Sequence, residues 1–223
     1  MKLKLLLSVL FLSTFIVSAH AQQISKGSVW LGGNIGYSQS KTDYNDANPT
    51  PDSKSHAFGF SPAIGIAVKD NLVVGANIFY QKNKTNNIGG SLEETNEKYL
   101  GAGVFIRRYI PIINRVYVFG DLNAWGRHYN FDGPAYTGSG IKIKTKGWDG
   151  GVSLTPGVSV GINKKLQLET GFNSLFSTYY SKRKTTSATT GYNYTISSFN
   201  AGFNLENKSM FYIGFRLLIS NKA

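Results

Sequence analysis

The segment from Gly147 to Ile162 alternates between two kinds of side chain. Its large apolar residues share one parity: Trp148, Val152, Leu154, Pro156, Val158, Val160 and Ile162. The other parity holds glycine, serine, threonine and aspartate. Because successive strand side chains point to opposite faces, this pattern predicts a strand with one apolar face and one small, polar face. Such a pair of faces favours a sheet with lipid outside and a narrow polar interior.

The N-terminus predicts export. Lys2 and Lys4 precede an apolar run over 5–17, and Ala19-His20-Ala21 follows it. A basic start, a short apolar core and an Ala-x-Ala site describe a signal peptide over 1–21, which leaves a mature domain over 22–223. The alternative is a membrane anchor, but the run is shorter than the ~20 residues of a spanning helix. The chain has no cysteine, so no disulfide framework supports the exported fold.

The charge balance is basic, with 24 Lys and Arg against 12 Asp and Glu. Removing Lys2 and Lys4 with the signal peptide lowers the net charge from +12 to +10. A basic excess can indicate a nucleic-acid partner, but an exported chain meets lipid phosphates instead. We therefore expect lipid headgroups, and no nucleic acid, as anionic partners.

Period-2 patterning extends along the mature chain. It predicts eight strands, at 28–40, 56–68, 72–82, 98–110, 116–129, 146–162, 166–179 and 196–219. Short links at 69–71, 111–115 and 163–165 alternate with longer polar links at 41–55, 83–97, 130–145 and 180–195. The prediction is an all-β fold, an eight-stranded antiparallel transmembrane β-barrel with short periplasmic turns and longer extracellular loops. Residues 204–209 interrupt the last strand, where a turn at 206–208 is the rival to one long strand.

Aromatic residues gather near the long-link ends of the strands, on the apolar parity. Such residues are typical of the girdle that meets lipid headgroups. The predicted lipid-facing girdle consists of Tyr37, Phe58, Phe60, Tyr80, Trp148, Phe172 and Phe176. Scattered surface aromatics are the alternative.

The opposite parity carries ionisable side chains into the predicted interior. This lumen polar cluster consists of Arg107, Asp121, Glu169, Arg216, Arg127 and Asp149. Burying charges unpaired is costly, so we expect Arg107 to pair with Asp121, and Glu169 with Arg216. Barrels of about eight strands have interiors just wide enough for side chains, which favours a permanent filling over a gate.

Basic residues cluster in two of the long links. The candidate headgroup-binding residues are Lys142, Lys144, Lys146, Lys182, Arg183 and Lys184. Lipopolysaccharide phosphates would accept their charge-assisted hydrogen bonds. The alternative is a solvated basic rim that only protects strand ends.

Catalysis has little support. His56 and His128 are the histidines of the mature chain. A lipid hydrolase could be imagined from His128 with Ser38 or Ser177, but an interfacial histidine is the simpler interpretation. No phosphate loop, zinc spacing or calcium loop occurs, so we expect no cofactor, no metal and no enzyme.

Two stretches carry a family resemblance: GAGVFIRRYIPI over Gly101–Ile112 and the closing SMFYIGFRLLI. With the alternating strands and the signal peptide, the mature chain resembles the small single-domain outer-membrane β-barrel family, similar in plan to OmpX and to the membrane domain of OmpA. The resemblance implies a non-enzymatic barrel in the outer membrane of a Gram-negative-type bacterium, a monomer inserted by the barrel-assembly machinery. Its implied roles are envelope integrity or adhesion to extracellular surfaces. One departure is that residues 220–223 follow Ile219, where the family often ends on an aromatic residue.

Two other functions stay open at this stage. A narrow porin-like channel would suit a lumen of glycine and asparagine, although Trp30, Phe105, Tyr117 and Phe119 share the inner parity and would obstruct it. A secreted lipocalin-like binder would instead turn the apolar faces toward an internal cavity.

Overall fold

The computed structural model describes residues 24–42, 52–88, 94–135, 141–172, 175–187, 190–203 and 211–219. The predicted signal peptide lies outside these residues. Ten antiparallel strands occur in the described ranges: β1 Val29–Thr42, β2 Asp52–Lys69, β3 Leu72–Ile88, β4 Glu94–Ile113, β5 Val116–Pro134, β6 Lys142–Gly161, β7 Leu166–Phe172, β8 Phe176–Ser187, β9 Asn193–Phe203 and β10 Phe211–Ile219. In these same ranges no helix is long and apolar enough to cross a membrane.

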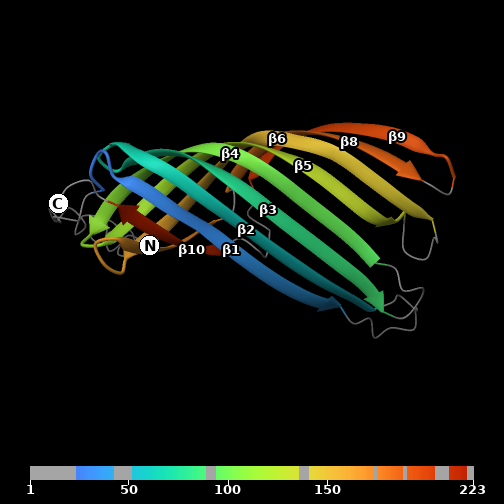
Figure 1. Ribbon diagram of the computed structural model, residues 1–223, viewed down its shortest axis with the longest axis horizontal. Coiled ribbons are helices and arrows are strands. Elements are labelled where there is room, and N and C mark those ends of the chain that lie inside the picture. Colours follow the sequence, from blue (N-terminus) through green and yellow to red (C-terminus); the bar gives the residue numbers. More distant parts are fainter. Residues whose placement is uncertain are drawn as a thin grey trace, which may run out of the picture.

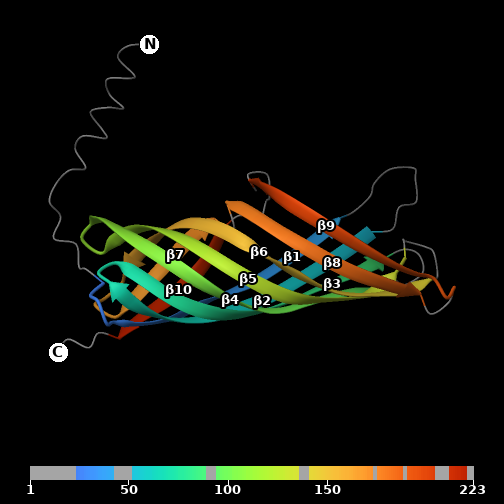
Figure 2. The same ribbon diagram turned by 90° about the horizontal axis from the view of Figure 1, so that it is seen from above.

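Eight of the strands pair into a closed ring. Each strand from β1 to β6 pairs with the next one along the chain, and β7 pairs with β10. The ring closes where β10 pairs with β1, in the register from Val29 opposite Ile219 to Asn34 opposite Gly214. Figures 1 and 2 show this ring at one end of the elongated molecule. The predicted all-β antiparallel architecture is thus confirmed.

The last two predicted strands are each divided. Residues 166–179 contain β7 and the start of β8, and 196–219 contain most of β9 and all of β10. Strand β6 pairs with β8 as far as Leu154, opposite Phe176, and with β7 from Gly157, opposite Gly171. Pro156 lies between the two stretches and has no backbone N–H to donate, which suits a break in the ladder. Strand β9 pairs with β8 and β10 pairs with β7. The choice between one long strand over 196–219 and a turn at 206–208 falls on residues 204–210, which lie outside the described ranges.

The strands also extend into the predicted long links. Strand β2 begins at Asp52, β3 runs to Ile88 and β4 begins at Glu94. The ladder of β3 with β4 continues to Asn86 opposite Glu94. Both faces are polar here, so the period-2 hydrophobic signal disappears while backbone pairing continues. The described parts of the predicted longer polar links therefore continue the strands as hairpins (Figure 1), and residues 43–51, 89–93, 136–140 and 188–189 lie outside the described ranges.

The apolar parity faces outward around the ring. Ile35, Ile64, Leu100, Val104 and Ile213 are each more than half exposed. The alternate residues point inward, where a cluster of Trp30, Phe105, Tyr109, Tyr117 and Phe119 is buried. The predicted parity is confirmed. The lipocalin-like alternative is wrong, because it requires these apolar faces to line an interior cavity.

The short-turn end of the ring is tied by the residues before β1. The backbone N–H of Ile24 donates to Oδ1 of Asn71, and the N–H of Asn71 donates to the carbonyl of Ile24, both at 2.9 Å. Asn71 and Arg115 adopt left-handed backbone conformations, with φ of 58° and 65°, in the two tight turns. These contacts fix the segment before β1 to the turn between β2 and β3 at this end of the ring.

Candidate functional site

A network of buried charges crosses the lower interior of the ring. Register places Arg107 of β4 directly opposite Asp121 of β5, and Nε of Arg107 donates to Oδ2 of Asp121 at 2.9 Å. Nη1 of Arg107 also donates to Oε2 of Glu169 at 2.7 Å, and Nε of Arg216 forms an ion pair with that same oxygen at 3.0 Å. The structure therefore brings both expected pairs into one network, in which Arg107 links the two carboxylates.

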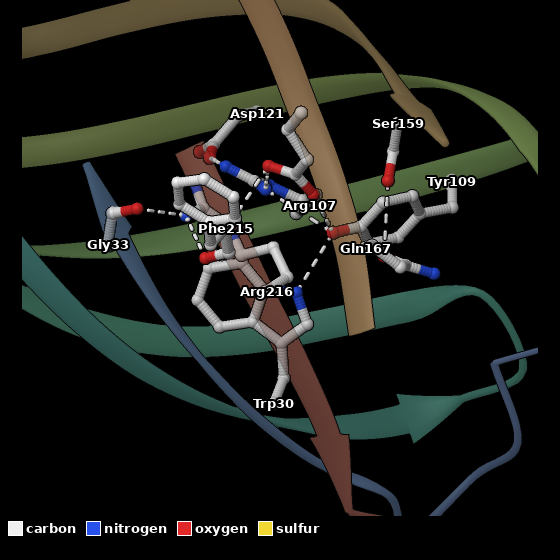
Figure 3. A network of polar contacts seen from close by, with 10 residues as sticks. Trp30, Gly33, Arg107, Tyr109, Asp121, Ser159, Gln167, Phe215 and Arg216 are labelled. Carbon is white, nitrogen blue, oxygen red and sulfur yellow. Dashed lines mark hydrogen bonds and ion pairs between the residues drawn. The ribbon is translucent and has the colours of Figure 1, made fainter. Parts of the chain in front are cut away.

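Aromatic rings contact this network, and Figure 3 shows those of Trp30 and Tyr109 beside the arginines. The guanidinium of Arg107 lies 4.4 Å from the ring centroid of Phe119 and 4.9 Å from that of Trp30, and that of Arg216 lies 4.7 Å from Trp30. Trp30 donates its indole N–H to the hydroxyl of Tyr109, which donates to Glu169 at 2.7 Å. Cation–π contacts of this kind strengthen when water is excluded. The four charges sum to zero, so the interior holds a neutral, tightly filled cross-section.

Sequence reasoning assigned the charges but missed Tyr109 and the hydrogen bond of Trp30. Tyr109 has the parity of Arg107 and follows it by two residues, so it lies on the same inner face. That parity was the signal that could have identified it. Ser159 and Gln167 add a further buried hydrogen bond of 3.1 Å beside Tyr109 (Figure 3).

A second network lies higher in the interior, around Asp149. This carboxylate is fully buried, pairs with Arg127 at 3.0 Å and lies 3.3 Å from Arg183. Arg127 lies over Tyr99 at 4.5 Å, and Arg183 lies over Tyr129 at 4.2 Å. Asp149 and Arg127 therefore form a network separate from the lower one, as expected from the similar low heights of Arg107, Asp121, Glu169 and Arg216 alone.

Arg183 departs from its predicted position among the headgroup-binding residues. Alternation along β8 turns its guanidinium inward onto Asp149, whereas Lys182 and Lys184 are exposed. Lys142, Lys144 and Lys146 are exposed on β6, and Lys144 lies 3.7 Å from Asp132. The remaining five basic residues thus share the outer face, with Lys146 opposite Lys184.

The predicted girdle residues lie on the outer face where their side chains are described. Tyr37 and Trp148 are at least half exposed, and Phe58 and Phe60 are 42 % exposed. Tyr80 lies 6.0 Å from Phe60 by ring centroid, and Phe176 lies 5.1 Å from Phe203. The side chain of Phe172 lies outside the described residues.

Polar pairs extend along the hairpins above these rings. Lys84 and Asn96 both bind the carboxylate of Glu94, at 2.7 and 2.6 Å. The hydrogen bond from Lys84, followed by that from Asn96, lowers the pKa of Glu94 below its ordinary value. Exposed pairs of this kind contribute little to stability.

The histidines do not assemble a catalytic set among the described residues. Nδ1 of His56 lies 3.1 Å from the Tyr37 hydroxyl, and Nδ1 of His128 lies 3.0 Å from Nδ2 of Asn130. His128 is on the outer face, whereas Ser177 pairs with the buried Ser153 of the inner face. Ser38 shares the inner parity of Trp30 on β1. Within the described ranges, no group of three or more His, Cys, Asp or Glu residues could hold a metal ion.

Comparison with known proteins agrees with this architecture. Residues 7–206 match the model of the outer membrane protein beta-barrel domain. Among solved structures, that of the outer membrane protein OprG from Pseudomonas aeruginosa is similar, with a TM-score of 0.50 and 15% sequence identity, covering 89% of this chain and 99% of that chain. At this identity the likeness shows the fold alone. No curated protein matches the chain.

Proposed function

The chain belongs to the family of outer membrane protein β-barrel domains, and from this premise we propose that it crosses the outer membrane as a sealed eight-stranded barrel with a non-enzymatic structural or surface-interaction role. Its location is the outer membrane of a Gram-negative-type bacterium. Envelope integrity or adhesion through the exposed hairpins would be its contribution.

The outer face supports this placement in the membrane. On β4, Ile106, Val104, Ala102 and Leu100 lie outward between Arg108 and Lys98. At about 3.3 Å per residue and a tilt of about 40°, the ten steps from Lys98 to Arg108 rise roughly 25 Å, the height of the apolar band in such barrels. The short turns and the strand ends near both termini would then be periplasmic, and the long hairpins extracellular.

The single observation that carries the proposal is the filled lower interior. Trp30, Tyr109, Tyr117 and Phe119 are each at most 2 % exposed, and Glu169 is 1 % exposed among them. Side chains with so little accessible surface leave no room for a solute beside them. Such a protein would act through its walls and its hairpins.

A narrow porin-like channel is the second candidate, and it draws on the upper interior. Asn77 and Asn123 both place Oδ1 beside Gly103, and neither oxygen accepts a hydrogen bond from the described residues. Polar acceptors of this kind suit a wet vestibule. A channel would need the lower network to open, which requires buried ion pairs to separate at a high cost.

The role is tested by deleting the gene from a strain that carries it. We expect greater sensitivity to detergents and large antibiotics, with unchanged uptake of small hydrophilic solutes, because a sealed barrel supports the envelope without transporting. The wild-type gene should restore resistance. Loss of small-solute uptake with an intact envelope would contradict the proposal and favour the channel.

A further inference from the structure

A row of lysines crosses four adjacent strands on the outer face. Lys82 of β3 lies directly opposite Lys98 of β4, Lys98 opposite Asn130 of β5, and Asn130 opposite Lys146 of β6. In the described part of the chain, these three lysines form no ion pair, and Lys144 beside them reaches Asp132 only at 3.7 Å. Like charges directly opposite each other destabilise a sheet. This arrangement therefore favours a bound anion.

The same lysines line a hollow rather than a flat surface. A cavity of about 470 Å³ is bounded by Lys82, Lys98, Lys144 and Lys146, with Asn96 and Asn130 among its other walls. Four cations against one carboxylate, Asp132, give its walls a net charge of +3. The cations fall on both sides of Asn130, two on β3 and β4 and two on β6. Two phosphates on one molecule would each meet a pair of lysines.

A second hollow lies below the first on β2 to β5. A groove of about 840 Å³ is formed where small outward residues, Pro62, Ala76, Ala102, Ala124 and Gly126, lie between Ile64, Ile78 and Val104. Ala102 is directly opposite Gly126 and Ile78. Along β4, Lys98 is four residues from Ala102, which places the lysines about 13 Å from the groove. This distance and the apolar walls suit an acyl chain attached to the anion above.

We propose that this outer wall of β2 to β6 binds one molecule of a phosphorylated outer-leaflet lipid, with phosphates on the lysine row and an acyl chain in the groove. Lys144 and Lys146 belong both to the predicted headgroup-binding residues and to this cavity. The proposal therefore gives part of the predicted basic rim a defined lipid site. The inference rests on the proposed membrane placement. A lipid carrying two phosphates, such as lipid A of lipopolysaccharide, matches the two pairs of cations.

The test measures retention of lipid A with two phosphates by the refolded full mature chain in detergent micelles, using native mass spectrometry. We expect one bound molecule per chain. The triple variant Lys82→Gln, Lys98→Gln, Lys146→Gln should bind at least tenfold more weakly, and Ala102→Leu, which narrows the groove, should also lose lipid. The triple variant Lys26→Gln, Lys69→Gln, Lys165→Gln removes the same charge at the other end and should bind as the wild type does.

Folding is monitored separately by heat-modifiable mobility on gels. The lysine-row variant loses like-charge repulsion and should fold at least as well as the wild type. Equal retention by the two triple variants would overturn the site, as would displacement of the lipid by an equal concentration of inorganic phosphate, which would indicate a simple anion site. Neither result depends on whether the lumen is sealed or on the deletion phenotype.

Discussion

Replacement of Glu169 with alanine is expected to lower the free energy of unfolding by about 3–5 kcal/mol, because it leaves buried guanidinium groups without their partner. Glu169 accepts hydrogen bonds from Arg107 and Tyr109, both at 2.7 Å, and forms an ion pair with Arg216. After the change, Arg107 retains Asp121, whereas Arg216 retains only its hydrogen bonds to the carbonyl oxygens of Gly33 and Phe215. Urea unfolding in lipid vesicles, followed by tryptophan fluorescence, measures the difference.

The matched control for this variant is Glu94→Ala. Glu94 also has a cationic partner, Lys84 at 2.7 Å, but both side chains are well exposed on a hairpin. Solvent replaces the lost pair there, so we expect no measurable change in stability. Comparable effects of the two substitutions would contradict the assignment of Glu169 to a water-excluded network.

Replacement of Gly75 with valine is expected to prevent formation of the folded barrel. Gly75 of β3 lies opposite Gly65 on one side and Phe105 on the other. A Cβ atom at Gly75 would overlap the carbonyl oxygen of Ile64 and lie 2.5 Å from Cζ of Phe105. The aromatic ring covers the glycine, as in other sheets where a ring packs over a glycine. Heat-modifiable mobility after refolding into vesicles should show no folded band.

Gly120→Val provides the contrast for this experiment. Gly120 lies on the outer parity of β5, and a Cβ atom there would meet no other atom within 4 Å. Valine suits a strand and a lipid-facing surface, so the folded band should be retained in full. Loss of folding in both variants would show that valine is harmful at any strand glycine. It would contradict the explanation that overlap with Phe105 prevents folding of the Gly75 variant.

The sequence predicted the faces of the sheet because hydrophobicity alternates wherever lipid lies outside. The same reasoning failed in the upper hairpins, where residues such as Lys84 and Asn96 leave both faces polar while the ladder continues. It also could not locate the change of pairing near Pro156, since one proline is tolerated in a strand that bulges. The alternation of hydrophobicity thus predicts well which face a side chain occupies, and it predicts the length of a strand poorly.

The sequence predicted which charged residues face the interior, but it predicted less well which of them pair with each other. Arg107 and Asp121 are close in sequence across one tight turn, so their register follows from the hairpin. The contact of Arg107 with Glu169 crosses the ring and depends on closure, which no local pattern encodes. Arg183 was predicted to bind headgroups because it lies between Lys182 and Lys184. Its own parity on β8 instead places it on the inner face with Asp149.

The most direct test of the sealed barrel is the single-channel conductance of the refolded mature chain in a planar lipid bilayer. Insertion is first established by heat-modifiable mobility, so that a silent bilayer cannot reflect unfolded protein. We expect no steady current steps from the inserted protein, because Trp30, Tyr109 and the charges around Glu169 fill the lumen. Reproducible ion steps from the wild-type chain would contradict it and establish a channel.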